Sequence, residues 1–258
     1  MTPPAQNSTG SSPGDGPVFS LVLPAYNEAA RLPDTFRHIG LARDAYAGSD
    51  QDIEVVLANN ASTDDTARIA GSYDCLVVHE EKRIISAVRN AGVRAARGTW
   101  VGCVDADTRI PPSSFNVIFN AIRDPKLMVG MTGARLDRDS PGIRFTTMAC
   151  LIPAILFQMD TGIVFFRKAD WEAIGGYDEA IFVAEDIDFL KRMGEEGKKT
   201  GRRRKRIKGA ICRTSSRKFD QEGDLHIFRM AFKLFPLLMW KKKGNHPLVQ
   251  RYWYERES

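Results

Sequence analysis

The sequence lacks the long apolar runs and clustered cysteines that identify membrane-spanning and disulfide-rich proteins. No run of about 18 apolar residues occurs in the 258 residues, so no transmembrane helix is expected. The N-terminus shows no basic region followed by an apolar core, so no secretory signal is expected. The cysteines lie far apart, which favours reduced, buried thiols over disulfides or a zinc site. These absences predict a cytoplasmic protein. Its four cysteines, expected as thiols, are Cys75, Cys103, Cys150 and Cys212.

Two nucleotide-binding fingerprints are also missing. No G-x-G-x-x-G follows the first apolar run, which argues against a dinucleotide-binding dehydrogenase, and no P-loop pattern occurs. The composition is that of an ordinary soluble protein, with 43% hydrophobic and 27% charged residues. The length suits one large α/β domain or two small ones.

The net charge of +5 is concentrated in one segment. Residues 198–208 contain eight Lys or Arg and no acid, so the rest of the chain is net acidic. Three interpretations are open: a solvated loop, contact with anionic lipid headgroups, or nucleic-acid binding. Aromatic residues are not interleaved with the basic ones, so we expect no nucleic-acid partner. A peripheral contact with the inner face of a membrane stays open.

Apolar runs alternate with amphipathic stretches from Val18 onward. A disordered tail is expected over residues 1–17, an α/β domain over 18–220, and a helical tail over 221–258. In this tail, apolar residues recur at helical spacing and are followed by Lys241, Lys242 and Lys243. The apolar face either covers a protein surface or lies on a membrane. Strands are expected at 19–23, 53–57, 75–78, 100–104, 128–136, 162–166 and 207–212. Helices are expected at 33–47, 84–97, 112–122, 168–174 and 184–193, with another from Ser62 or Thr63 to Ala70. This alternation predicts a mostly parallel sheet flanked by helices.

Two carboxylates follow the expected strand at 100–104. Asp105 and Asp107 flank Ala106 just past the carboxyl end of this strand, the edge at which open α/β sheets bind ligands. Carboxylates one residue apart can share a hard divalent cation, and that cation can hold a diphosphate. Surface turns are also rich in Asp, so the pattern alone is weak.

Polar segments follow the first two strands at the same edge. The first is Pro24-Ala25-Tyr26-Asn27-Glu28, in which Pro24 is expected to end the strand pairing because it lacks an N–H. The second contains Asn59 and Asn60, whose amides suit a base edge or ribose hydroxyls. The alternatives are an ordinary turn for the first segment and a helix cap for the second.

Two arginines and an acidic helix start complete the set. Arg83 and Arg89 precede the strand at 100–104 and can face phosphate or base, or simply lie on an exposed helix surface. Glu185 and Asp186, with Asp188 nearby, begin an expected helix. Such acids repel one another unless a cation or a proton is shared, although a helix N-terminus also favours them.

Six segments in chain order carry these residues: LVLPAYNEAARL, NNASTDDT, RNAGVRAARGTW, VDADTRIP, GIVFFRKADWEAIGGYDE and AEDIDF. Together they resemble the family 2 glycosyltransferases. The resemblance implies the GT-A fold, a single Rossmann-like, mostly parallel sheet flanked by helices. It also implies an inverting transferase of the hexosyltransferase type, which uses Mg²⁺ or Mn²⁺ to move a sugar from a nucleoside-diphosphate sugar to an acceptor hydroxyl. The acceptor, whether a saccharide, a lipid-linked or a small molecule, is not implied.

The resemblance also assigns roles to residues of this chain. Asp107 and Asp105 would hold the metal, and Asp186 would be the catalytic base, with Glu185 as its rival. Arg217, in a Ser-Arg stretch, is expected to reach the diphosphate. Family members usually carry an Asp where this chain has Asn59-Asn60, so the base is undetermined. The expected nucleotide-sugar pocket comprises Pro24, Ala25, Tyr26, Glu28, Asn59, Asn60, Arg83, Arg89, Asp105, Ala106 and Arg217.

Two rival functions are consistent with parts of the sequence. A nucleotidyltransferase that makes nucleotide sugars shares the fold class, but it usually has a Gly-rich basic loop after the first strand, which is absent from residues 24–31. A non-catalytic module that binds a polyanion or a membrane would depend on the basic run and the tail.

Overall fold

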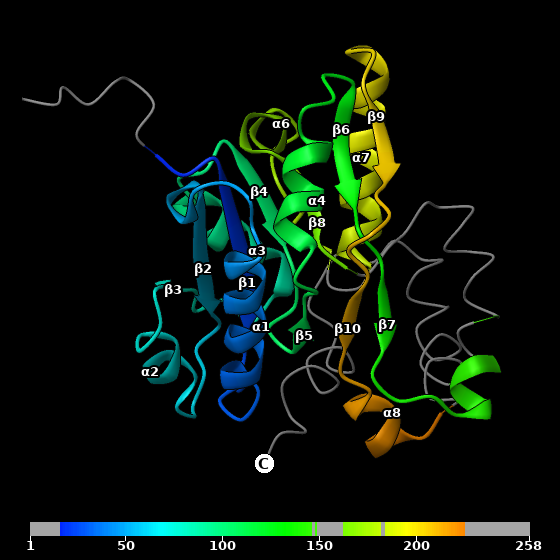
Figure 1. Ribbon diagram of the computed structural model, residues 1–258. Coiled ribbons are helices and arrows are strands. Elements are labelled where there is room, and N and C mark those ends of the chain that lie inside the picture. Colours follow the sequence, from blue (N-terminus) through cyan, green and yellow to red (C-terminus); the bar gives the residue numbers. More distant parts are fainter. Residues whose placement is uncertain (1–15, 146–147, 149–161, 182–183, 225–258) are drawn as a thin grey trace, which may run out of the picture.

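The computed structural model describes residues 16–145, 148, 162–181 and 184–224. Its central feature is a seven-stranded sheet with the order β3-β2-β1-β4-β8-β6-β9 (Figure 1). The strands are β1 (Phe19–Ala25), β2 (Ile53–Asn59), β3 (Leu76–His79), β4 (Trp100–Cys103), β6 (Leu127–Met131), β8 (Val164–Arg167) and β9 (Arg203–Arg206). The expected tails lie almost entirely outside the described residues.

The first four strands are parallel, as the alternation of apolar runs and helices predicts. β1 pairs in parallel with both β2 and β4, and β2 pairs in parallel with β3. The connecting helices are α1 (Leu32–Asp44), α2 (Thr66–Ala70) and α3 (Ile85–Ala95). β8 breaks the pattern because it runs antiparallel to both β4 and β6, and β9 then pairs in parallel with β6.

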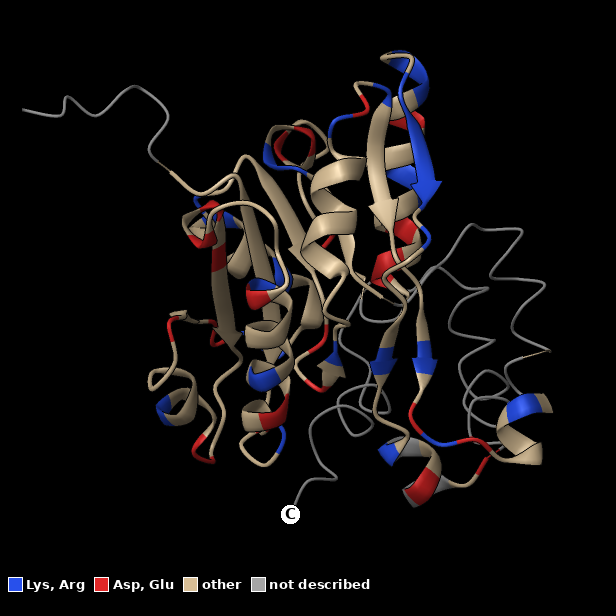
Figure 2. Cartoon of the chain, in the orientation of Figure 1, with Lys and Arg blue, Asp and Glu red and all other residues tan. Residues whose placement is uncertain are grey.

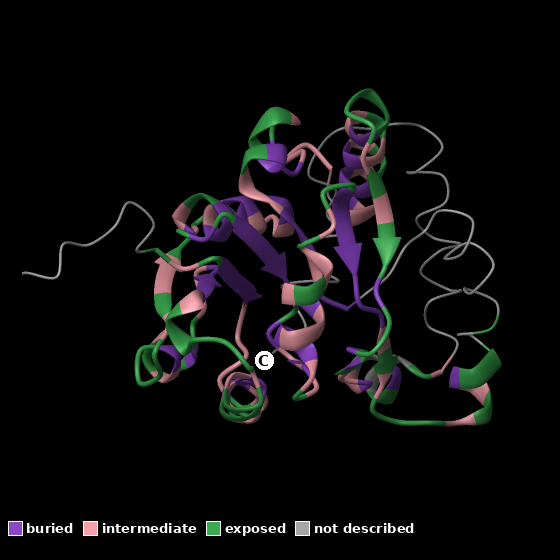
Figure 3. Cartoon of the chain, turned by 45° about the horizontal axis from the view of Figure 1, so that its top comes forward, coloured by how far each residue is buried: buried purple, intermediate pink, exposed green. Residues whose placement is uncertain are grey.

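Apolar side chains on the two faces of the sheet form two separate cores. One core joins the sheet to α1, α2 and α4 (Ser114–Ala121), with Phe36 and Phe115 among its members. The other joins it to α3, α6 (Lys168–Ala173) and α7 (Glu185–Lys199), with Trp171 and Phe189 among its members. The inner strands β1, β2, β4 and β6 are buried along their whole length, whereas the edge strands β3 and β9 are largely exposed or half-buried (Figure 3). The arrangement is a three-layer α/β/α sandwich.

A second, three-stranded sheet connects distant segments. It has the order β5-β10-β7 and consists of β5 (Thr108–Arg109), β7 (Ala134–Leu136) and β10 (Cys212–Thr214). β5 follows the Asp105-Ala106-Asp107 loop directly, and its Thr108 is paired with Thr214. Because β10 leads into α8 (Arg217–Glu222), this small sheet brings Arg217 to the loop that carries the two aspartates.

In the second half of the chain, three predicted elements have other bounds in the structure. The strand expected at 128–136 is divided at Thr132–Gly133, and its halves, β6 and β7, belong to different sheets. The strand expected at 207–212 is replaced by β9 and β10. The helix expected to close at Gly194 continues to Lys199 as α7, and Gly194 lies inside it, where the Arg204 side chain packs closely against the helix.

The basic run is not simply a solvated loop. It contains the end of α7 and the whole of β9, an edge strand that stands out as a continuous basic segment in Figure 2. Arg202 forms a two-pronged ion pair with the buried Asp170, with both N···O distances at 2.7 Å. Arg204 donates to the carbonyl of Leu190 in α7. Arg202 and Arg204 therefore hold β9 against the rest of the domain. Charged side chains on an edge strand also discourage pairing with other chains.

Cys75, Cys103 and Cys212 form no disulfide; Cys103 and Cys212 are buried, as predicted, whereas Cys75 is half-buried. Burial raises the pKa of Cys103 to about 11 and that of Cys75 to about 12. Cys150 lies outside the described residues. Within the described ranges, no helix combines the length and apolar character that a membrane crossing requires.

Candidate functional site

The end of β1 reaches further than its proline suggests. Pairing with β2 continues through Ala25, opposite Asn59, so the prediction that Pro24 ends the pairing is wrong on this side. Along β1 the carbonyls of Val18 and Val22 face β4, and Pro24 follows the same alternation. Its missing N–H therefore lies on the side of β4, where pairing has already stopped, and no hydrogen bond to β2 is lost.

The turn after β1 is locked to the turn after β2. Asn27 has a φ of 51°, a conformation that Asn tolerates better than most residues. Its backbone N–H donates to Ser62 Oγ at 3.0 Å, and its side-chain oxygen accepts the N–H of Thr63 at 2.9 Å. The prediction that Ser62 or Thr63 begins the following helix is therefore wrong, because α2 begins only at Thr66.

Asn59 and Asn60 are both buried, and their amides already have protein partners. Asn60 donates from Nδ2 to the carbonyls of Glu80 and Lys82, at 2.9 and 2.8 Å. Asn59 donates to His79 Nδ1 at 3.1 Å. The amide of Asn60 thus fixes the loop that leads to Arg83, and Arg83 lies over the ring of Tyr26 at 5.4 Å.

The Asp105-Ala106-Asp107 loop leaves the sheet just after β4, where the sequence places it. Thr35 in α1 donates to the carbonyl of Ala106 at 2.7 Å, which holds the middle of the loop. The Asp105 side chain is 56% exposed. Asp107 accepts a hydrogen bond from Thr214 in β10 at 3.5 Å. Two hard oxygen donors therefore lie at the predicted edge of the sheet.

The second acidic segment lies at the first turn of α7. Ala184, directly before it, has a φ of 62°, a strained value for a residue with a side chain. Glu185 is buried, whereas Asp186 is only partly buried and accepts the backbone N–H of Ile187 at 2.9 Å. Burial raises the pKa of Glu185 above its ordinary range, and the neighbouring Arg89 opposes that rise. Asp188 is neutralised by Arg192 at 2.6 Å.

Arg89 joins the two acidic segments. Its Nη1 donates to Glu185 at 2.9 Å and its Nη2 donates to Asp105 at 3.2 Å. The ring of Tyr177 lies beneath the guanidinium at 5.6 Å. Two acids from distant segments, Asp105 and Glu185, are therefore held by one guanidinium, and the convergence of Asp107 and Asp186 around a bound ion stays a prediction.

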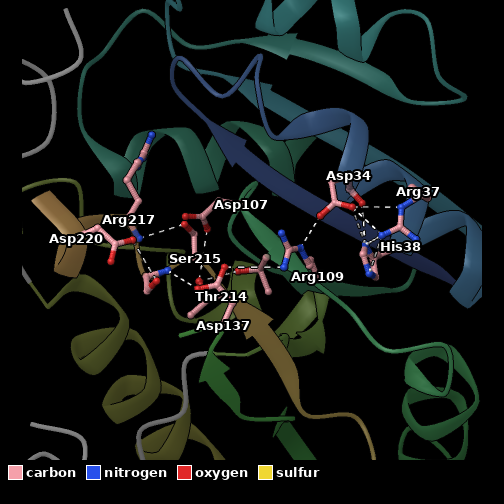
Figure 4. Close-up of polar contacts among 12 residues, drawn as sticks. Asp34, Arg37, His38, Asp107, Arg109, Asp137, Thr214, Ser215, Arg217 and Asp220 are labelled. Carbon is pink, nitrogen blue, oxygen red and sulfur yellow. Dashed lines mark hydrogen bonds and ion pairs between the residues drawn. The ribbon is translucent and has the colours of Figure 1, made fainter. Parts of the chain in front are cut away.

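Arg217 crosses from α8 to the turn after β1. Its Nη2 donates to Glu28 Oε1 at 3.1 Å, and both side chains are largely buried. Figure 4 shows Asp107, Thr214, Ser215 and Arg217 together, with the side chain of Arg217 directed away from Asp107. In the structure Glu28 is the partner of the Arg217 guanidinium, and the expected contact of Arg217 with the diphosphate stays a prediction.

The described residues contain no group of three or more His, Cys, Asp or Glu that could hold a metal ion by itself. The Asp105-Ala106-Asp107 loop offers two carboxylates, which is fewer than a metal site made by the protein alone would need. Mg²⁺ is commonly bound by one or two carboxylates, with phosphate oxygens and water completing the shell. The donor set fits a cation of this kind, whose coordination needs a ligand besides the protein.

One residue without a predicted role organises the site. Asn90, buried in α3, donates to the carbonyl of Tyr177 at 2.9 Å and accepts the N–H of Tyr177 at 2.9 Å. This reciprocal pair fixes the segment before α7 against α3. The sequence does contain a signal for it, because Asn90 is a polar residue on the apolar face of a helix.

Comparison with known proteins places this geometry in context. The model of the family described as glycosyl transferase family 2 matches residues 20–173. Chondroitin synthase of Escherichia coli is 25% identical over 197 residues, which are 70% of this chain and 27% of that protein. Glycosyltransferase GlyG of Streptococcus pneumoniae is 25% identical over 218 residues, 82% of this chain and 64% of the relative. The chain thus spans about a quarter to two thirds of the length of these curated relatives.

Solved structures share the fold at low sequence identity. The mannosyltransferase PcManGT from Pyrobaculum calidifontis, in complex with GDP-Man and Mn²⁺, has a TM-score of 0.63 and 18% identity, covering 95% of this chain and 70% of that one. S. aureus TarS in complex with UDP-GlcNAc has a TM-score of 0.58 and 20% identity, covering 77% and 58%. The predicted fold class, a GT-A α/β sandwich with a mostly parallel sheet, is confirmed.

Proposed function

The chain belongs to glycosyl transferase family 2, and from this premise we propose that it transfers a hexose from a nucleoside-diphosphate sugar to an acceptor hydroxyl, with inversion at the anomeric carbon. The observation that carries the proposal is the meeting of Asp105 and Glu185 at Arg89. It brings together two acidic segments that are about eighty positions apart in the sequence. One segment serves the donor and the other the acceptor.

The proposed donor pocket lies at the ends of β1 and β2. Tyr26 and Arg83 offer a flat surface for the base, and the turn at Asn59 and Asn60 closes the pocket beside them. Because the amide of Asn60 is committed to two carbonyls, we propose that it shapes the base pocket by holding the loop. Arg217 is proposed to exchange its contact with Glu28 for the donor diphosphate.

A divalent cation, Mg²⁺ or Mn²⁺, is proposed to bind at Asp107 with help from Asp105. When bound, it offsets the negative charge that grows on the departing diphosphate. The protein's part is to present two carboxylates on a loop fixed by Thr35 and Thr214. The Mn²⁺ in the PcManGT complex supports the choice of ions to test.

Asp186 is the proposed catalytic base. Its rival Glu185 is buried and engaged by Arg89, so it cannot readily reach an acceptor. Asp186 lies one residue further into the helix and keeps part of its side chain at the surface. It is proposed to take the proton of the acceptor hydroxyl as that oxygen attacks the anomeric carbon, while the bond to the diphosphate breaks.

The test is turnover of labelled donor sugars with and without EDTA. UDP-GlcNAc and GDP-Man are included because similar structures contain them. We expect release of the nucleoside diphosphate from at least one donor, dependent on a divalent ion, and a product of inverted anomeric configuration by NMR. Absence of turnover across UDP-, GDP- and dTDP-sugars, each tested with saccharide and lipid-linked acceptors, would contradict the proposal.

A cytoplasmic location with peripheral membrane contact stays a prediction. Flotation with liposomes of anionic lipid tests it, with Lys205→Gln/Lys208→Gln as the variant of the basic run. We expect the wild type to float with the liposomes and the variant to float less. Equal flotation of the two, or none, contradicts the contact.

A further inference from the structure

We propose that Arg89 is a positioning residue that holds the donor-side loop and the acceptor-side helix at a fixed separation. The inference deepens the proposed function and rests on it. It also replaces the expectation that Arg89 binds the nucleotide sugar, since each terminal nitrogen of its guanidinium already has a carboxylate partner within the protein.

The geometry of Arg89 is that of a bridge between two elements. The residue lies in the middle of α3, and its side chain is only 15% exposed. One terminal nitrogen reaches Asp105, two residues before Asp107, and the other reaches Glu185, next to Asp186. Each functional aspartate is therefore the neighbour, or near neighbour, of a residue that Arg89 holds.

The carboxylates around Arg89 explain why a positively charged side chain is needed at this point. Asp105 comes from the loop after β4, and Glu185 and Asp186 come from α7, so three carboxylates face the same region. Without a cation between them, their repulsion would push the loop and the helix apart. A planar guanidinium with several donors can satisfy two carboxylates at once, which a lysine ammonium does less well.

Packing fixes the position of the guanidinium. The ring of Tyr177 lies beneath it, and Tyr177 is in turn held through its backbone by Asn90, one residue after Arg89 in α3. Arg89 Nε is buried and has no hydrogen-bond partner among the described residues. The hydrogen bonds of the guanidinium therefore go to Glu185 and Asp105, and its place is set by residues of α3 and by Tyr177.

The experiment compares Arg89→Gln, Arg89→Lys, Glu185→Gln and the double variant Arg89→Gln/Glu185→Gln in donor turnover. Arg94→Gln is the matched control, because Arg94 lies on the same helix, is 54% exposed, and only approaches Glu179 at 3.7 Å. The readouts are kcat, the KM for the donor, and the affinity for the nucleoside diphosphate with Mn²⁺ measured by calorimetry.

We expect Arg89→Gln to lower kcat about 10- to 100-fold, because the reacting groups are displaced, while the donor KM changes less than about threefold. Arg89→Lys should recover part of the rate. The double variant should be faster than Arg89→Gln, because it no longer leaves Glu185 buried without a counter-ion. Arg94→Gln should behave as the wild type. If Arg89→Gln does not fold, Glu185→Gln must show the same fall in kcat at constant KM.

Two results would overturn the inference. One is a large rise in donor KM and a loss of nucleotide affinity at unchanged kcat, which would make Arg89 a donor ligand. The other is independent, additive effects of Arg89→Gln and Glu185→Gln. Failure of the proposed function is a separate outcome, because in that case the wild type itself would turn over no donor.

Discussion

The two halves of the chain contribute to the site in different ways. Up to the end of β4, the site residues are placed by the backbone, because they follow parallel strands whose ends meet at one edge. From β6 onward the strand directions are mixed, and the site residues Glu185 and Arg217 reach the first half through ion pairs with Arg89 and Glu28. The first half therefore supplies a rigid donor platform, and the second half is attached to it by side chains.

This difference implies that substitutions in the two halves will have different consequences. Changes at the strand ends of the first half should appear mainly in stability or donor affinity, because the residues there also support the framework. Changes at the start of α7, and at Arg89, which is paired with it, should appear mainly in the rate of transfer. Arg217 belongs to the second half but is proposed to bind the donor, so a change there should appear in the donor KM. Four predictions examine this contrast, beginning with the largest effect.

The largest effect is expected for Asp186→Asn. An amide cannot accept the acceptor proton, so kcat should fall by about 10²- to 10⁴-fold. The affinity for the nucleoside diphosphate should stay within about twofold of the wild type, as measured by calorimetry. Asp188→Asn is the control on the same helix turn, because Asp188 is paired with Arg192. Equal losses in the two variants would indicate a general disturbance of α7 instead of removal of a base.

The second prediction concerns Glu54, a buried acid of the first half. It accepts hydrogen bonds from Ser20 at 2.6 Å, from the Arg97 N–H at 2.8 Å and from Arg97 Nε at 2.6 Å. Burial alone would raise its pKa, but these hydrogen bonds lower the pKa below the ordinary value of 4.5. Glu54→Gln should cost about 2–3 kcal/mol of stability at neutral pH, with kcat almost unchanged.

The sign of the pH dependence follows from that lowered pKa. A carboxylate with a lowered pKa stabilises the fold above its unfolded-state pKa, and this contribution is lost as the pH falls. Thermal melts should therefore show the largest difference between wild type and Glu54→Gln near neutral pH, narrowing below about pH 4.5. A difference that does not depend on pH would show that the charge of Glu54 is unimportant.

The third prediction concerns Asn60→Asp, which exchanges a buried amide for a carboxylate. In this chain the carboxylate would face the carbonyls of Glu80 and Lys82, to which Asn60 now donates. We expect a loss of about 2 kcal/mol in stability and weaker nucleotide binding. Asn59→Asp is the comparison and should cost less, since it loses only the contact with His79. Improved nucleotide binding by Asn60→Asp would contradict the assigned role.

The fourth and smallest effect is expected for Arg217→Gln. Loss of one charge-assisted contact with the diphosphate should raise the donor KM about tenfold, with little change in kcat. Arg213→Gln, in the preceding strand β10, is the control because Arg213 is exposed. Kinetics of Arg217→Gln that match the wild type would show that the contact with Glu28 is purely structural.

The sequence predicts the first half well for a physical reason. Strands such as β1 and β2 are buried on both faces, so each gives a continuous apolar run that is followed by a polar turn at the ligand edge. The position of the Asp105-Ala106-Asp107 loop follows from that pattern alone. The resemblance to a known family then adds roles for Asp107 and Asp186.

The remainder could not be predicted because it depends on contacts between distant segments. β9 consists of Arg203–Arg206, and nothing in such a charged run signals a strand, since its order comes from pairing with β6. The pairing of Arg89 with Glu185 and Asp105 likewise joins residues with no fixed sequence spacing. The sequence identifies Arg89 as an important residue but does not reveal its partners.

The most direct test of the account is anomalous diffraction from crystals grown with Mn²⁺ and a nucleoside diphosphate. The account predicts an anomalous peak within coordination distance of the Asp107 carboxylate, with the diphosphate on the same ion and Asp186 across the sugar position. Bound nucleotide without a peak at Asp107, or a peak located elsewhere, would contradict the claim that the two halves build one metal-dependent transfer site.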